Sequence, residues 1–206
     1  MIENFITSSC VISNNTVYKN GQSLFVNKAE DTGGFLVSAY QHFSINYPKY
    51  YKMDNMCRLG LLSAELLLKD FKKREYNPSE VGVVLSNASA SLDTDIKYYK
   101  TTDDIASPAL FVYTLPNIVI GEICIRHHFK GENAFFITEK FDPDFTVQYV
   151  NNLFDNNVLR ACVCGWIELF RDTFKTVLIL VERVAGSNEI TFNKENFNNI
   201  YQSDNG

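Results

Sequence analysis

The side chains that could do chemistry are scattered along the chain, and no spacing among them completes a catalytic set. Ser86 to Ser91 follows an apolar run but lacks the Gly-x-Ser-x-Gly pattern that places a nucleophilic serine on a strained turn. We interpret this segment as a hydrogen-bonded turn, with a serine nucleophile as the alternative. Cys162 and Cys164 would share one face of a strand. A zinc site needs a second ligand pair, which the sequence lacks, so we predict two buried strand cysteines and no metal site.

His127 and His128 are the next candidates, at the end of an apolar segment. Adjacent residues of a helix point about 100° apart, so both rings cannot face one site. A single catalytic base among them stays open. Asp93 and Asp95 diverge in the same way, and we expect one of them to cap a helix. The residue types alone therefore define no active site.

The charge pattern argues against a nucleic-acid partner. The net charge is −5, and no Lys or Arg stripe could follow a phosphate backbone. The densest basic group should lie in the last turn of a helix, where it complements the helix dipole; it comprises Lys69, Lys72, Lys73 and Arg74. Residues 1–5 lack the basic start of a signal peptide, and no apolar stretch approaches the roughly 18 residues of a membrane span. We expect a cytoplasmic protein that does not bind a membrane.

Apolar periodicity predicts the elements that must position these residues. Helical spacing predicts helices over 53–74, 93–100, 116–128 and 143–154, the last capped by Asp142. Apolar runs predict strands over 5–13, 81–85, 134–138, 158–167 and 176–184, and the tail from 189 adds a weak strand and a short helix. Residues 14–50 show no clear period. This alternation, in 206 residues that are 46% hydrophobic, predicts one α/β domain over 1–206.

Residues 107–123 resemble a segment of the β-ketoacyl synthases, which have the thiolase-like fold. The shared pattern is Ser-Pro, then Asn117, then Gly121 and Ile123. Tyr51-Lys52-Met53-Asp54 resembles the family's (Arg/Lys)-Met-Asp helix, and 158–168 its strand ending in Gly-Gly-x-Glu, of which Gly165 and Glu168 are kept. The resemblance covers roughly 50–184. It implies a truncated thiolase-like fold, the N-terminal half of a β-ketoacyl synthase, with a mixed sheet and helices on both faces.

The resemblance also implies the loss of the nucleophile. Counted from Gly131, the family's Thr-Ala-Cys falls on Thr138-Glu139-Lys140. The amine of Lys140 cannot form the thioester through which condensation passes. The family's two histidines belong to a C-terminal half that is not in this sequence. We therefore expect no catalytic residue, no cofactor and no condensing activity by this chain alone.

Short relatives of this family, the chain length factors of aryl polyene and flexirubin-type pathways, lack the cysteine and resemble the same half. Asn117, Gly121 and Phe141 agree with their pattern. This implies a non-catalytic subunit that pairs with a full-length β-ketoacyl synthase and works with an acyl carrier protein, in fatty-acid or polyketide-type biosynthesis.

The family's pairing mode implies which residues would act. The strand before the nucleophile meets the partner, so the interface candidates are Ala134, Phe135, Phe136 and Ile137. The substrate-tunnel candidates are Leu110, Phe111, Tyr113, Thr114 and Phe141. The alternative is that these side chains fill the protein's own core. Two other functions stay open: a homodimeric scaffold or regulator without an acyl ligand, and a divergent acyl-thioester enzyme using Lys140 with His127 or Asp142.

Overall fold

The fold is built around one mixed β-sheet. A computed structural model describes residues 3–28, 30–183 and 190–203. The strands are β1 (Phe5–Ser13), β2 (Thr16–Lys19), β3 (Gln22–Val26), β4 (Val81–Asn87), β5 (Asn133–Ile137), β6 (Ala161–Phe170), β7 (Thr173–Glu182) and β8 (Ile190–Thr191). They follow the order β3-β2-β1-β7-β6-β4-β5, and β8 pairs with β1. The pairs of β4 with β5 and with β6 are parallel, whereas β6–β7, β7–β1, β1–β2 and β2–β3 are antiparallel.

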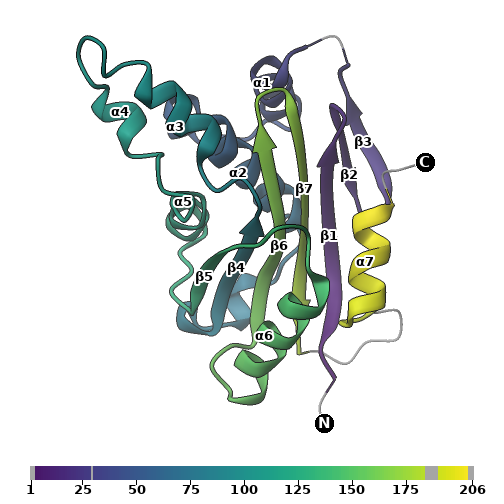
Figure 1. The fold of residues 1–206 in the computed structure, drawn as a ribbon. Helices are drawn as coiled ribbons and strands as arrows, with labels where there is room; N and C mark the ends of the chain where they lie inside the picture. The colour runs from purple at the N-terminus through teal and green to yellow at the C-terminus, as the bar shows by residue number, and fades with distance from the viewer. Residues whose placement is uncertain (1–2, 29, 184–189, 204–206) are drawn as a thin grey trace.

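Helices cover both faces of this sheet (Figure 1). They are α1 (Thr32–His42), α2 (Asn55–Leu67), α3 (Leu92–Tyr99), α4 (Pro108–Phe111), α5 (Ile118–His127), α6 (Pro143–Asp155) and α7 (Lys194–Gln202), with short 3-10 turns at Pro48–Lys52, Lys73–Glu75 and Pro78–Glu80. The layer of α1, α2 and α5 lies on one face, and α6 and α7 lie on the other. The arm formed by α3 and α4 projects beside α5 (Figure 1).

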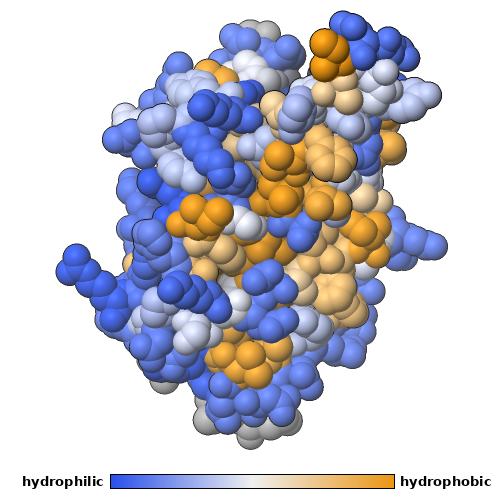
Figure 2. Space-filling view, turned by 90° about the vertical axis from the view of Figure 1, so that its left-hand side faces the viewer, coloured by the Kyte–Doolittle hydropathy of each residue, from blue (hydrophilic) through white to orange (hydrophobic). Residues whose placement is uncertain are grey.

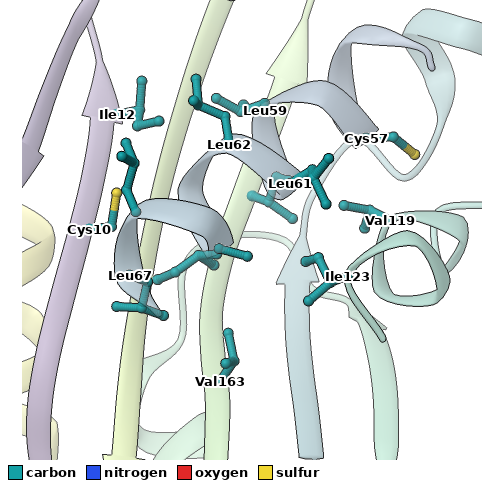
Figure 3. Close-up of a cluster of buried hydrophobic side chains, with 14 of the residues drawn as sticks. Cys10, Ile12, Cys57, Leu59, Leu61, Leu62, Leu67, Val119, Ile123 and Val163 are labelled. Atoms are coloured by element: carbon teal, nitrogen blue, oxygen red, sulfur yellow. The ribbon is translucent and has the colours of Figure 1, made fainter. Parts of the chain in front are cut away.

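The helix α2 is the centre of the first layer. The carboxylate of Asp54 caps it by accepting from the Cys57 amide at 2.9 Å. Its leucines point toward the strands and toward Val119 and Ile123 of α5 (Figure 3). A Cβ on Gly60 would come within 2.2 Å of the Val119 side chain, so only glycine lets α5 approach this closely. This packing holds α5 against the sheet.

The second core lies between the sheet and the layer of α6 and α7. Cys162 and Cys164 are fully buried there together with Phe154 and Phe197, which confirms the prediction of two buried strand cysteines. Between β6 and β7 the strands come so close at Gly165 that a Cβ would lie 2.0 Å from a carbonyl oxygen. The predicted cap of α6 is also present, because Asp142 accepts from the Phe145 amide at 2.9 Å.

Three local predictions are wrong. α2 ends at Leu67, so Lys69 to Arg74 follow the helix and do not lie in its last turn, because Phe71 turns back to pack on Tyr76 and Phe129. The apolar run 134–138 predicts a buried strand, but β5 is only partly buried because it lies at the edge of the sheet. The apolar residues of 116–128 predict a core helix buried on all sides, but α5 leaves Ile125 exposed. Residues 14–50, which showed no period, form β2, β3 and α1.

Candidate functional site

The edge of the sheet at β5 is the first feature of the candidate site. Within the described residues, β5 has β4 as its one neighbour, so its outer backbone groups have no strand to pair with. Phe135 packs toward the α2 and α5 layer, and Phe136 packs edge-on to Phe145 at 4.8 Å on the other face. Ile137, at the end of the strand, is 52% exposed. The interface candidates therefore form an open strand edge.

Exposed apolar side chains also lie on the arm of α3 and α4 and on α5, on the same side of the molecule as this edge (Figure 1). We call them the β5-edge surface, and they are Leu92, Ile96, Tyr99, Ile105, Phe111, Val112, Leu115, Ile125 and Ile137. They come from α3, α4, α5, β5 and the segments that join them. Figure 2 views the molecule from this side and shows a broad apolar area there. Monomeric proteins rarely expose large apolar patches, so such a surface indicates an interaction site.

Four of the five tunnel candidates lie together around α4. Phe111 is 59% exposed and stands 5.4 Å from the ring of Tyr98, and Leu110 is half-buried. The hydroxyl of Thr114 donates to the Phe111 carbonyl at 2.8 Å. Tyr113 is 7% exposed and belongs to the core with α2 and α5, as the core-filling alternative described it. The segment therefore offers Phe111 outward and Tyr113 inward.

The fifth candidate, Phe141, lies elsewhere. Its ring stacks on Tyr201 with the centroids 4.0 Å apart, and meets Phe197 edge-on at 5.0 Å. Trp166 completes this cluster on the α7 side of the sheet. The structure does not bring Phe141 together with the α4 residues.

An ion pair with one buried partner lies behind the α4–α5 segment. Glu122 of α5 is 4% exposed, and its Oε1 atom lies 2.8 Å from Nζ of Lys49. Its Oε2 atom is buried without a hydrogen-bond partner among the described residues. Burial, and then the Glu122 charge, raise the pKa of Tyr113 to about 12, so its phenol stays protonated. The sequence carried one signal for this pair, an acidic residue inside an otherwise apolar helical segment.

Lys140 is exposed in the segment between β5 and α6. Its carbonyl accepts from the Thr138 hydroxyl at 3.0 Å, and its side chain lines an open pocket with Asp142 and the start of α7. The Asp142 carboxylate is engaged as the α6 cap. Lys140 is exposed, and the pocket that it lines is open to solvent and does not enclose a substrate.

His127, the proposed partner of Lys140 in the enzyme alternative, lies apart from it. It is near the other end of β5 and on the α2 side of the sheet, 3.3 Å from Glu65 and stacked on Phe129. Burial lowers the pKa of His127 to about 4, and Glu65 opposes this shift. The pair Lys140 and His127 is therefore not assembled.

The other chemical candidates have structural partners. Asp93 accepts from Lys97 at 2.6 Å and from the Arg171 amide at 3.0 Å, and Asp95 accepts from the Ser91 hydroxyl. The expectation that one of these aspartates caps α3 is wrong, since Ser91 is the N-cap. Burial raises the pKa of Cys164 and keeps it a thiol. Across the described ranges, no group of three or more His, Cys, Asp or Glu could hold a metal ion, and no helix is long and apolar enough to cross a membrane.

Comparison with solved structures relates this fold to ketosynthases and chain length factors. No protein-family model matches the sequence, and comparison with curated proteins gives no match. A type II polyketide synthase ketosynthase in complex with its acyl-carrier protein (AntDE:AntF) matches with a TM-score of 0.65 and 13% identity over 88% of this chain. The ishigamide ketosynthase/chain length factor matches with a TM-score of 0.64 and 14% identity over 91%. The ketosynthase ApeO in complex with its chain length factor ApeC from Xenorhabdus doucetiae gives 0.58 and 13% over 90%.

These likenesses confirm the predicted fold class, an α/β thiolase-like fold with a mixed sheet and helices on both faces. The chain spans 62% and 64% of the length of the first two matched chains, and 81% of the third. At this level of identity the likeness concerns the fold.

Proposed function

We propose that this chain is a non-catalytic subunit resembling a chain length factor, which pairs along β5 with an active β-ketoacyl synthase. The observation that carries the proposal is the open edge of β5 inside the β5-edge surface. The proposed pathway is a fatty-acid or polyketide-type synthesis that uses an acyl carrier protein. The finer assignment, to aryl polyene or flexirubin-type pigments, rests on Asn117, Gly121 and Phe141.

The open edge of β5 favours pairing with a further strand. An unpaired strand edge presents free N–H and C=O groups that another strand can pair with. Phe111, Leu115 and Ile125 are exposed on the arm and on α5, and their side chains gain free energy when a partner removes them from water. Backbone pairing would set the register, and the apolar side chains would supply affinity.

Similar proteins support the choice of partner. The matched structures include a ketosynthase with its chain length factor and a ketosynthase with its acyl-carrier protein. If this chain pairs in the same manner, the partner would supply the nucleophile, since the nucleophile-equivalent position here is Lys140. Leu110, Phe111 and Thr114 would then face the partner's tunnel, where the bulk of Phe111 would limit the growing chain.

Co-expression with a candidate synthase from the same genome tests the proposal. We expect the two chains to co-purify and to elute together on size exclusion with light scattering. Ile137→Lys, at the β5 edge, should abolish the complex while leaving the fold intact, because Ile137 is half exposed. The matched control is Leu24→Lys on β3, a 41% exposed residue at the opposite edge of the sheet.

Two results would contradict the proposal. Either Leu24→Lys disrupts the complex as strongly as Ile137→Lys, or the chain forms a stable homodimer that excludes the synthase. The second result would favour the scaffold or regulator. Turnover of acyl thioesters by the purified chain, lost in Lys140→Ala, would favour the enzyme.

A further inference from the structure

The helix α7 lies on the second face of the sheet, and its sequence is a weak helix former (Figure 1). Three of its nine residues are the asparagines Asn196, Asn198 and Asn199, which are less favourable in a helix than Ala or Leu. A helix shorter than about 12 residues is marginal in water on its own. The stability of α7 therefore depends on the side chains that it packs against the rest of the chain.

Those side chains form a single stripe along the helix. Phe197 is fully buried, and Ile200 and Tyr201, three and four residues further on, are half-buried against the same core. The ion pair between Lys194 and Asp144 is 3.8 Å long and exposed on both sides, so it contributes little. The exposed residues of the helix are Lys194, Glu195, Asn198, Asn199 and Gln202. One aromatic and aliphatic stripe thus holds α7 in place.

Phe141 is the centre of this contact, and it comes from the segment that joins β5 to α6. Its ring is nearly parallel to that of Tyr201, with the centroids 4.0 Å apart, and it meets Phe197 edge-on at 5.0 Å. Both arrangements are favourable for aromatic rings. Nζ of Lys175 on β7 lies 4.2 Å from the centre of the Tyr201 ring. α7 is therefore attached to residues 138–142 through Phe141.

Cavities lie along two different faces of α7. One of about 620 Å³ lies between α7 and β1, where Asn199 and Ile200 line it together with Ile6 and Val11. The other, of about 660 Å³, lies between α7 and residues 140–143. A helix with open space on two faces has few contacts outside its stripe, and segments with few buried contacts open at a lower free energy than the whole fold.

We propose that α7 is a detachable latch, which holds residues 138–142 through the stack of Tyr201 on Phe141 and opens as a unit while the sheet stays folded. Opening would free Phe141 and join the two cavities into one groove. The Thr138 amide, which donates to the Asn87 carbonyl at 2.9 Å, lies at the start of the latched segment. If β5 pairs with a synthase, the latch also steadies the end of the pairing strand, because Thr138 follows Ile137 directly; this consequence alone rests on the proposed function.

Hydrogen exchange of the free chain, followed by NMR, tests the latch. The reporters are the amides of residues 198–202, which are hydrogen-bonded within α7. The reference is α6 on the same face of the sheet, a longer helix that buries Thr146, Val150 and Phe154. We expect the α7 amides to exchange about a hundredfold faster than those of α6, because α7 opens without unfolding the sheet.

Variants test whether the stack is the contact that closes the latch. Phe141→Leu and Tyr201→Leu should each speed exchange of the α7 amides about tenfold. Tyr201→Leu should also speed exchange of the Thr138 amide. The double variant should fall well short of the product of the two single effects, because both substitutions break the same stack. The matched control is Phe145→Leu on α6, whose ring packs on Phe136 and Tyr149 and which should leave α7 unchanged.

Three outcomes overturn the proposal. Equal exchange rates in α7 and α6 would show that α7 is a fixed part of the helix layer. Single effects that multiply fully in the double variant would show that Phe141 and Tyr201 act independently. An effect of Phe145→Leu as large as that of Phe141→Leu would mean general destabilisation. The experiment needs no synthase, so its failure leaves the test of pairing at β5 unaffected.

Discussion

Nζ of Lys49 lies 2.8 Å from Oε1 of Glu122, and this ion pair ties the 3-10 turn Pro48–Lys52 to the middle of α5. The hydrogen bond to Glu122 raises the pKa of Lys49, opposed by the smaller effect of burial. The carboxylate is buried while the lysine is half exposed, so the two partners are not equivalent. Removing the lysine leaves a buried charge without compensation.

We therefore expect Lys49→Met to lower the free energy of unfolding by about 2 kcal/mol, a value reduced because the lysine is half exposed. Urea unfolding followed by fluorescence measures it. The control is Lys72→Met, whose pair with Glu75 is exposed on both sides and 3.9 Å long, and which should change stability by no more than about 0.5 kcal/mol. If the two variants lose the same unfolding free energy, the burial of Glu122 does not make its ion pair more important for stability than an exposed one.

Stability in acid should depend on His127. Its pKa is about 4 in the folded chain against an ordinary value of 6.5, so folding favours the neutral ring. The resulting stabilisation is complete above about pH 6.5 and is lost as the pH falls to about 4. His127→Gln should reduce the loss of unfolding free energy over this range by about 2 kcal/mol.

Unfolding curves between pH 7 and pH 4 measure this dependence. His128→Asn is the matched control, because His128 is exposed and asparagine suits its left-handed backbone, where φ is 60°. The same slope for the wild type and for His127→Gln would show that other groups cause the acid sensitivity. The carboxylate of Glu65, 3.3 Å from the His127 ring, is the first such group to vary.

The two sides of the α4–α5 segment should respond differently to truncation. Phe111→Ala should change stability by no more than about 0.5 kcal/mol, because the ring is largely exposed. Tyr113→Ala should cost about 3 kcal/mol, because the ring lies in the core. If the chain acts as proposed, Phe111→Ala should also lengthen the products of a reconstituted synthase, as mass spectrometry would detect. If the complex stays intact and the products are unchanged, Phe111 does not line the tunnel.

Substitution by alanine should have opposite effects on stability at two glycines. At Gly165, φ is +155° and a Cβ would meet the Val177 carbonyl oxygen at 2.0 Å, so Gly165→Ala should destabilise by about 4 kcal/mol or prevent folding. At Gly121, inside α5, a Cβ meets no atom within 4 Å. Gly121→Ala should therefore stabilise by about 0.5–1 kcal/mol. The melting temperatures of both variants test this. A Gly165→Ala variant that melts at the temperature of the wild type would show that β6 and β7 can separate there.

The local sequence pattern predicted those strands and helices that depend on neighbouring residues. The apolar run of Val81 to Leu85 marked β4, and Asp142 followed by Pro143 marked the start of α6, as the structure confirms. Such signals depend on neighbours within a few residues. The segment 14–50 carried none, because β2 is short and β3 is short and largely exposed, so neither shows a clear apolar alternation.

The sequence by itself determined most of the central strands and helices, and the resemblance of residues 107–123 to one family led to the proposal that Lys140 stands at the nucleophile-equivalent position. Tertiary structure alone decided that β5 lies at an open edge, that Phe141 packs on Tyr201 and not with Phe111, and that His127 and Lys140 lie near opposite ends of β5. The physical reason is that strand order and helix placement depend on contacts between residues far apart in the chain. The apolar sequence pattern of a strand is the same in the middle of a sheet as at an unpaired edge.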